Sequence, residues 1–254
     1  MIDLHLVGLP RTGSSWALYY FTGVLRHAGI QFVDLFEPSN PRLRFIPKDL
    51  GYKVAGFQAE DENTHDDCIR MYESFSHMHR LIKHCFTPPC VPLMEYMLQR
   101  PGIRWIEVRR DPFERYLSWA IAERTGVWVT TKQDRLDEAK QALEPFAAPI
   151  DDLLKELANA RLYEQSKARM LGDAECIGVI NYDTLHADCI ELSKRVLPHY
   201  GAEIENACLT NLGLLDPNGD LLPRKSMTLE EKKHMVINWR ELQQVIIEQL
   251  HKNA

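Results

Sequence analysis

The pattern of hydrophobic positions changes its period early in the chain, at a loop that contains two glycines. Residues 4–7 are mostly apolar and predict a short buried strand. From Ser14 to about residue 25 the apolar residues recur at helical spacing, which predicts a helix. The residues between them, 8–13, have the sequence Gly-Leu-Pro-Arg-Thr-Gly and predict a tight turn. The chain therefore opens with a strand, a glycine loop and a helix N-terminus.

The rest of the chain alternates between the same two periods. Short apolar segments predict strands at residues 31–36, 52–57, 80–85, 103–108 and 175–182. Helical spacing predicts helices at residues 66–75, 92–99, 112 onward, 133–169 with a break at 145–149, and 228–250. This alternation predicts an α/β fold, a P-loop-like three-layer domain with a mostly parallel central sheet flanked by helices. We expect residues 1–254 to form a single domain, because that length is enough for one ample core.

The opening strand, loop and helix together predict an anion site. The backbone N–H groups of such a loop converge, and the helix dipole adds about half a positive charge. Ser14 and Ser15 add hydroxyl donors, and Arg11 adds a cation within the loop. A nucleoside-triphosphate P-loop has a lysine directly after its second glycine, and here Ser14 stands in that place. The loop therefore favours a phosphate-like group without magnesium-dependent ATP chemistry.

A second set of phosphate-binding residue types follows the strand predicted at residues 103–108. Arg110 comes at the end of that strand, and a guanidinium binds phosphate strongly through paired hydrogen bonds. Pro112 suits the first turn of a helix. Ser118 lies about two turns further along, on roughly the same helix face, so its hydroxyl is placed to donate to the same phosphate. An amphipathic helix with a basic start is the plainer interpretation of these residues taken alone.

Composition narrows the partners and the location. A net charge of −6 and a pI near 5.9 argue against a nucleic-acid partner, which requires a basic surface. The six cysteines contain no C-x-x-C pair and predict reduced, buried thiols. No apolar run approaches the ~20 residues that span a bilayer, and a core strand predicted from Ile2 leaves no place for a signal peptide. We expect a cytoplasmic protein with no membrane span, and a homodimer is left open.

Residues 10–16, Pro-Arg-Thr-Gly-Ser-Ser-Trp, fit the pattern P-[KR]-[ST]-G-[ST]-[ST]-[WFL] throughout. The chain thereby resembles sulfotransferases that use 3′-phosphoadenosine 5′-phosphosulfate (PAPS). Residues 110–118 match the 3′-phosphate motif of the same family, a strand followed by R-x-P-x-x-x-x-x-S. The resemblance implies that Arg110 and Ser118 bind the 3′-phosphate and that Trp16 packs against the adenine. It implies that the 5′-phosphosulfate is bound by the loop, which consists of Pro10, Arg11, Thr12, Gly13, Ser14, Ser15 and Trp16.

The resemblance also implies a general base. Glu37 precedes Pro38 after the strand predicted at residues 31–36, where carbohydrate sulfotransferases carry a Glu-Pro whose glutamate is the base. A carboxylate suits this role, although a solvated loop carboxylate is the plainer interpretation of Glu37 taken alone. His84 is the second candidate, because cytosolic aryl and steroid sulfotransferases have a K-T-H motif whose histidine is the base. Here Lys83-His84 is one residue shorter, a shift that turns a strand side chain to the opposite face.

Three further segments bear on the acceptor and the nucleotide. Residues 118–128 resemble a stretch of the bacterial trehalose 2-sulfotransferase group, with Arg124 where that group has glutamine, which implies a carbohydrate or glycolipid-type acceptor. Tyr182 begins a segment similar to the Y-E-D-L of the family, which implies a place beside the adenine. Arg224 and Lys225 lie in a late basic loop, which implies contact with the 3′-phosphate.

The family resemblance thus predicts an enzyme. It implies in-line transfer of a sulfuryl group from PAPS to a sugar hydroxyl, with adenosine 3′,5′-bisphosphate as the product and no metal. Arg11 and the loop amides are expected to stabilise charge on the leaving phosphate, and Arg110 to bind the other end of the same nucleotide. Two alternatives stay open. One is a P-loop nucleotide or small-molecule kinase, which needs the lysine that the loop lacks, and the other is a non-catalytic nucleotide-binding module.

Overall fold

The computed structural model describes residues 1–35, 37–39, 65–126, 137–138, 141–212 and 229–251. The chain divides into two compact units, which are described separately below. The first contains Met1–Arg109 and Tyr163–Asp220, and the second contains Arg110–Leu162 and Leu221–Ala254. The organisation of residues 1–254 as a single domain stays a prediction.

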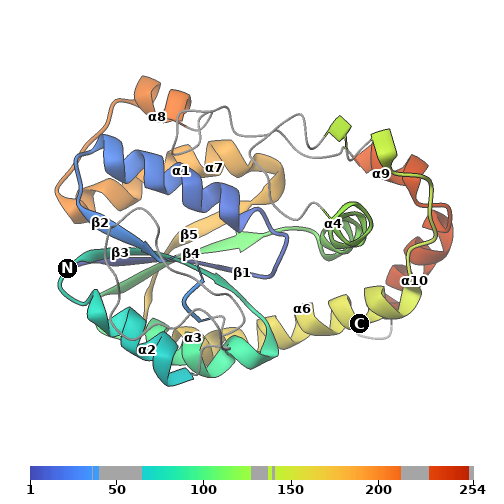
Figure 1. The fold of residues 1–254 in the computed structure, drawn as a ribbon, viewed down its shortest axis with the longest axis horizontal. Coiled ribbons are helices and arrows are strands. Elements are labelled where there is room, and N and C mark those ends of the chain that lie inside the picture. Colours follow the sequence, from blue (N-terminus) through green and yellow to red (C-terminus); the bar gives the residue numbers. More distant parts are fainter. Residues whose placement is uncertain (36, 40–64, 127–136, 139–140, 213–228, 252–254) are drawn as a thin grey trace. The chain divides into compact units, whose positions relative to one another are not determined.

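A five-stranded sheet forms the centre of the first unit (Figure 1). Its strands lie in the order β2-β3-β1-β4-β5, and each neighbouring pair is parallel. Their bounds are β1 (Asp3–Gly8), β2 (Phe32–Leu35), β3 (His79–Cys85), β4 (Ile103–Arg109) and β5 (Glu175–Asn181). This confirms the predicted α/β class and these five predicted strands, whereas the strand predicted at residues 52–57 lies outside the described residues.

Helices cover both faces of this sheet (Figure 1). On one face, α1 (Ser14–His27), α7 (Leu185–Val196) and α8 (Asn206–Leu212) pack side chains such as Phe21, Leu192 and Leu209 against Leu4 and Leu6 of β1. On the other face, α2 (His65–Ser74) and α3 (Val91–Leu98) pack against β2 and β3. Short 3₁₀ turns are η2 (Pro88–Cys90), η3 (Tyr182–Thr184) and η4 (Leu197–Tyr200). The predicted arrangement of a sheet between two helical layers is confirmed within this unit.

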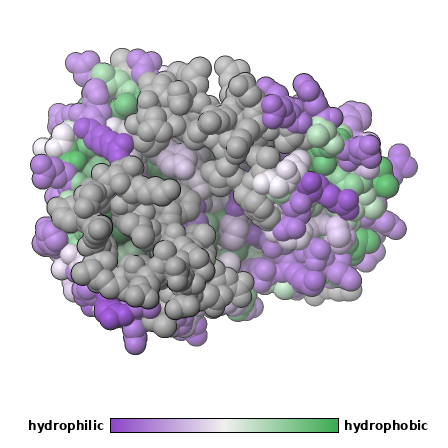
Figure 2. Space-filling view, viewed as in Figure 1, coloured by the Kyte–Doolittle hydropathy of each residue, from purple (hydrophilic) through white to green (hydrophobic). Residues whose placement is uncertain are grey.

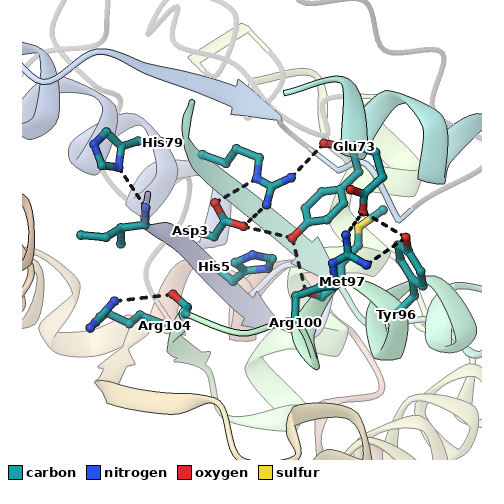
Figure 3. A network of polar contacts seen from close by, with 12 residues as sticks. Asp3, His5, Glu73, His79, Tyr96, Met97, Arg100 and Arg104 are labelled. Carbon is teal, nitrogen blue, oxygen red and sulfur yellow. Dashed lines mark hydrogen bonds and ion pairs between the residues drawn. The ribbon is translucent and has the colours of Figure 1, made fainter. Parts of the chain in front are cut away.

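A network of polar side chains joins the amino-terminal ends of β1 and β3 to α2 (Figure 3). Arg80 forms a buried ion pair with Asp3, with Nε donating to Oδ1 at 2.9 Å. Tyr72 donates its hydroxyl to Asp3 Oδ2 at 3.1 Å, and its backbone oxygen accepts from Arg80 Nη1 at 2.9 Å. The guanidinium also lies 3.9 Å from the centroid of the Tyr72 ring. Charge and hydrogen bonds are thus satisfied inside the fold, which is what a buried ion pair requires.

The second unit is built around helices, with α4 (Pro112–Thr125), the first part of α6 (Ile150–Leu171), α9 (Leu229–Met235) and α10 (Trp239–His251). Asp111 caps α4 by accepting a hydrogen bond from the Glu114 backbone at 2.9 Å, and Pro112 occupies the first turn as predicted. Apolar residues of α4 and α10 form its core with those around Phe146.

The prediction of one continuous helix over residues 228–250 is wrong, because α9 ends at Met235 and α10 begins at Trp239. Between them Val236 pairs with Phe146 as an isolated parallel bridge. The Asn238 amide binds both backbone groups of Ala148, donating to its oxygen and accepting from its nitrogen at 2.9 Å each. These long-range hydrogen bonds replace helical ones, and the apolar spacing of the sequence does not reveal them.

Hydrophilic residues cover most of the coloured surface in Figure 2. Hydrophobic residues gather over the C-terminal helices, where Ile237 and Ile247 are exposed. Among the helices that the structure describes, no helix has the length and apolar character needed to cross a bilayer.

Candidate functional site

The loop between β1 and α1 has an unusual backbone. Arg11 has a φ of 66°, and among the described residues no other non-glycine residue has a positive φ. Gly13, directly before α1, has a φ of 92°. A left-handed conformation costs an arginine about 1–2 kcal/mol relative to the right-handed one, and such strain is typical of functional loops. The strain at Arg11 therefore points to a site in this loop.

Each glycine of the loop motif lies where a side chain does not fit. A Cβ atom on Gly8 would lie 2.5 Å from the backbone oxygen of Val108 in β4. A Cβ atom on Gly13 would lie 2.9 Å from the ring of Tyr182, in addition to the strain from its positive φ. The Tyr182 ring thus packs against the loop, which gives it a defined structural role beside the predicted anion site.

The N-terminus of α1 is suited to an anion. Its N-cap residue, Gly13, has no side chain to cap it, and its first turn, Ser14–Ser15–Trp16, contains no acidic residue. The first helical hydrogen bond runs from the Ala17 nitrogen to the Gly13 oxygen, at 3.1 Å. The dipole and the N–H groups of the first turn therefore favour negative charge at this end. Thr12 has a structural role in the loop. Its hydroxyl donates to the Leu9 oxygen at 2.9 Å and closes the turn.

A second cation reaches this loop from β3. Lys83 Nζ donates to the Ser15 hydroxyl at 2.9 Å and lies 2.5 Å from Oε1 of Glu37, with a side chain only 3% exposed. Lys83 was not among the site residues predicted from the sequence. A signal was present, since a lysine inside an apolar strand is almost never buried without a charged partner. The structure identifies that partner as Glu37.

Glu37 lies on the same face of β3 as the loop. It is buried, pairs with Lys83, and also forms a side-chain hydrogen bond with Cys85, which in turn contacts the Ser14 hydroxyl at 3.8 Å. Burial raises the pKa of the Cys85 thiol to about 12, and Glu37 contributes to the rise while Lys83 opposes it. The structure thus brings Glu37 and the loop together through Lys83 and Cys85.

His84 lies on the opposite face of β3 from Lys83, as expected for neighbouring strand residues. It is fully buried, and both ring nitrogens have partners: Nε2 lies 2.8 Å from Nδ1 of His5, and Nδ1 lies 2.8 Å from the Ser39 hydroxyl. Burial, together with the neighbouring His5, lowers the pKa of His84 well below its ordinary value. A buried imidazole that is already hydrogen-bonded at both nitrogens is poorly placed to take a proton from a substrate.

Trp16 lies partly buried on α1, against other aromatic side chains. Its ring stacks on Tyr20 with centroids 5.7 Å apart and meets the edge of His186 from α7 at 5.9 Å. Pro10 forms part of the turn before Arg11 and is half-buried. The contact with His186 packs the beginning of α1 against α7.

The residues of the second motif belong to the second unit. Arg110 precedes α4 and contacts Glu114 at 3.4 Å, and its side chain is only 5% exposed. Ser118 is buried two turns along the same helix. Arg224 and Lys225 lie outside the described residues.

Comparisons with known proteins gave structural similarity alone. No protein-family model matches the chain, and no curated protein matches its sequence. The chain is similar in structure to a sulfotransferase from Alicyclobacillus acidocaldarius, with 16% identity over 90% of this chain and 86% of that chain and a TM-score of 0.46. It is also similar to mouse sulfotransferase SULT7A1 complexed with PAP, with 12% identity over 94% and 81% of the chains and a TM-score of 0.45.

A third similar structure is retinol dehydratase in complex with androsterone and the inactive cofactor PAP. It shares 11% identity with this chain over 99% of this chain and 80% of that chain, with a TM-score of 0.42. These values are too low to carry a conclusion about activity. The fold follows from the strand pairings of this chain itself.

Proposed function

We propose that the protein is a PAPS-dependent sulfotransferase. The observation that carries the proposal is the loop at residues 10–16, which fits the family pattern at each position and joins β1 to an α1 N-terminus without a side-chain cap. Arg11 adds a guanidinium within that loop, and Lys83 adds an ammonium at Ser15. Amides, hydroxyls and two cations suit a dianionic phosphosulfate.

PAPS, when bound, supplies the sulfuryl group that passes to the acceptor. The loop amides with Ser14 and Ser15 hold its phosphosulfate, while Arg11 stabilises the negative charge that the departing phosphate gains. Glu37 accepts the proton of the acceptor hydroxyl, whose oxygen bonds to sulfur as the sulfur–oxygen bond to the phosphate breaks. Glu37 is preferred to His84 as the base because it lies on the loop side of β3 and pairs with Lys83.

The nucleotide contacts beyond the loop are proposed from the sequence. Arg110 and Ser118 bind the 3′-phosphate, since a strand followed by their motif matches the family, with Arg110 directly before the N-cap of α4 and Ser118 within that helix. Arg224 and Lys225 are proposed as further contacts to the same phosphate, and Tyr182 and Trp16 as neighbours of the adenine. The remote phosphate provides binding energy that orients the reacting end.

A carbohydrate or glycolipid-type acceptor is proposed from the resemblance at residues 118–128 to the trehalose 2-sulfotransferase group. The test is transfer from ³⁵S-labelled PAPS to a panel of mono- and disaccharides that includes trehalose and glucose, with glycolipids and simple phenols as further arms. A labelled sugar supports the full proposal. Labelled phenol alone keeps the sulfotransferase assignment and overturns the carbohydrate assignment.

The same assay distinguishes the two alternatives. A kinase transfers phosphate from ATP only when magnesium is present, whereas sulfuryl transfer proceeds with EDTA in the buffer. A non-catalytic nucleotide-binding module binds adenosine 3′,5′-bisphosphate and labels no acceptor in the panel. Phosphate transfer that needs magnesium would overturn the proposal.

A further inference from the structure

Residues 37–39, shortly after β2, are bound from both faces of β3. On the loop face, Lys83 Nζ lies 2.5 Å from Glu37 Oε1. On the other face, His84 Nδ1 lies 2.8 Å from the hydroxyl of Ser39, two residues along. Lys83, His84, Glu37 and Ser39 are all less than a tenth exposed. Two neighbouring residues of one strand therefore contact two residues of the same short segment.

A buried histidine supports this contact from behind. His5 of β1 presents Nδ1 to His84 Nε2 at 2.8 Å, and the two rings stack with centroids 5.0 Å apart. The other nitrogen of the ring, His5 Nε2, is buried and has no hydrogen-bond partner among the described residues. A buried N–H without an acceptor is the rarer and costlier case, so the proton of His5 belongs on Nδ1.

That assignment sets the direction of the whole chain of hydrogen bonds. His5 Nδ1–H donates to His84 Nε2, which leaves the proton of His84 on Nδ1. His84 Nδ1–H then donates to the Ser39 oxygen. Both rings are neutral in this arrangement, which suits a site where burial and the charge of Arg80 lower the pKa of His5 to about 3. The position of Ser39 is thus fixed by a buried row that begins in the central strand.

We propose that Lys83 and His84 form a two-sided clamp that positions Glu37. Lys83 binds Glu37 directly, His84 binds Ser39 two residues further along, and His5 holds the ring of His84 in place. In this proposal His84 positions the base and is not itself the base. The inference rests on the proposed function of Glu37, because a clamp of this kind matters when a carboxylate must meet an acceptor oxygen. Displacement of a reacting group by about 1 Å costs up to ~10²-fold in rate.

The test uses Ser39→Ala in the full-length chain, with Ser193→Ala as a matched control. Ser193 is equally buried and its hydroxyl donates to the Cys189 oxygen at 2.8 Å. It lies on α7, far from Ser39 in the sequence. Each variant loses one buried hydroxyl, so each is expected to lower the melting temperature by a similar few degrees. Only Ser39→Ala is expected to lower kcat, by about 10- to 100-fold, with an adenosine 3′,5′-bisphosphate Kd within about twofold of wild type.

Nitrogen NMR on ¹⁵N-histidine-labelled protein tests the clamp without the sulfuryl-acceptor substrate. The signals of His84 are assigned by their loss in His84→Gln. In wild type both His84 and His5 are expected to carry the proton on Nδ1. Ser39→Ala is expected to shift the His84 Nδ1 signal, and Ser193→Ala to leave it unchanged. A proton on His84 Nε2, or a His84 signal indifferent to Ser39→Ala, would overturn the clamp.

Failure of the clamp and failure of the proposed function give different results. Wild-type protein that binds no adenosine 3′,5′-bisphosphate would overturn the proposed function and with it the catalytic meaning of the clamp. If the nucleotide binds and the acceptor is labelled, but Ser39→Ala keeps the kcat of wild type, the clamp alone is wrong.

Discussion

Two buried ion pairs lie three residues apart on β3, and they have different surroundings. Arg80 binds Asp3 through two nitrogens at the amino-terminal end of the sheet, where Tyr72 completes the contacts of both. Lys83 binds Glu37 at the other end of the strand, and it also binds Ser15 of the loop. The contacts of the first pair are with residues of the sheet and α2. The second pair also contacts the loop at residues 10–16, which is the predicted anion site.

The comparison shows how burial of charge can serve two purposes on one strand. A planar, bidentate guanidinium suits a permanent contact, while the ammonium of lysine is a point charge that is easily shared between partners. We therefore expect the loss of the Arg80 pair to appear in stability and the loss of the Lys83 pair to appear in turnover. The predictions below test that division, in order of decreasing effect.

Glu37→Gln is expected to lower kcat by ~10²–10⁴-fold, because the amide cannot accept the acceptor proton. The amide keeps nearly the same shape and can still accept a hydrogen bond from Lys83, but it leaves that buried ammonium without its counter-charge. The variant is therefore also expected to be less stable than wild type, and its kcat is compared at a temperature where it is folded. Steady-state kinetics with labelled PAPS and thermal unfolding measure the two effects. Full turnover in this variant would remove Glu37 from the reaction.

Arg80→Met is expected to lower the free energy of unfolding by about 3–5 kcal/mol, because it leaves the Asp3 carboxylate buried without its cation. Urea unfolding measures this loss. At a temperature where the variant is folded, its kcat should equal that of wild type. A stable variant with low kcat would contradict the division between the two pairs.

Arg110→Ala is expected to weaken the binding of adenosine 3′,5′-bisphosphate by about 2–4 kcal/mol, the cost of losing one charge-assisted contact to a phosphate. Calorimetric titration measures the change. Unchanged affinity would remove Arg110 from the 3′-phosphate site.

Acid is expected to destabilise the protein through the buried histidine pair. The folded state keeps the pKa of His5 at about 3 and that of His84 also below its ordinary value, whereas both rise to about 6.5 on unfolding. The unfolded state therefore binds more protons below pH 6.5, and stability falls as the pH decreases from there towards 3. The slope is up to ~1.4 kcal/mol per pH unit for each ring.

Urea unfolding at pH 7, 6, 5 and 4 measures this slope, with His5→Phe as the comparison. The variant should lose the contribution of its own ring and show a shallower dependence than wild type. An equal slope in both proteins would show that His5 is not held neutral in the folded state.

Arg11→Gly and Arg11→Ala separate the charge of Arg11 from its backbone conformation. Both variants lose the guanidinium, so both should lose most turnover. The glycine variant should be more stable than the alanine variant by about 1 kcal/mol, because only glycine adopts the positive φ of 66° at this position without strain. Equal stability of the two would contradict the strained loop.

The sequence predicted the sheet and the loop well because both depend on local patterns. The alternation of apolar runs fixed the five strands of the first unit, and the two glycines fixed the turn at residues 8–13. The same reasoning missed the break between α9 and α10, since that break depends on Asn238 binding Ala148, which lies 90 residues away. Spacing along a helix carries no information about such a partner.

The candidate site was predicted in part for the same reason. Glu37 was proposed from the resemblance of its Glu-Pro, after a strand, to that of carbohydrate sulfotransferases, but its pairing with Lys83 depends on β2 and β3 lying side by side. His84 attracted attention as a histidine near a family motif, while its contacts with His5 and Ser39 are long-range and appear only in the folded chain. Residue type suggested the two candidate bases, and tertiary contacts show that Glu37 lies near the loop whereas His84 is buried and hydrogen-bonded at both nitrogens.

The proposed function depends on one property of the protein: the loop around Arg11 binds the phosphate end of a sulfated adenine nucleotide. Isothermal titration calorimetry of the full-length protein with adenosine 3′,5′-bisphosphate, in EDTA, tests it most directly, with Arg11→Gly as the paired variant. We expect one bound nucleotide per chain without metal, and an affinity lowered at least tenfold by Arg11→Gly. No binding to wild type, or binding of ATP with magnesium in its place, would contradict it.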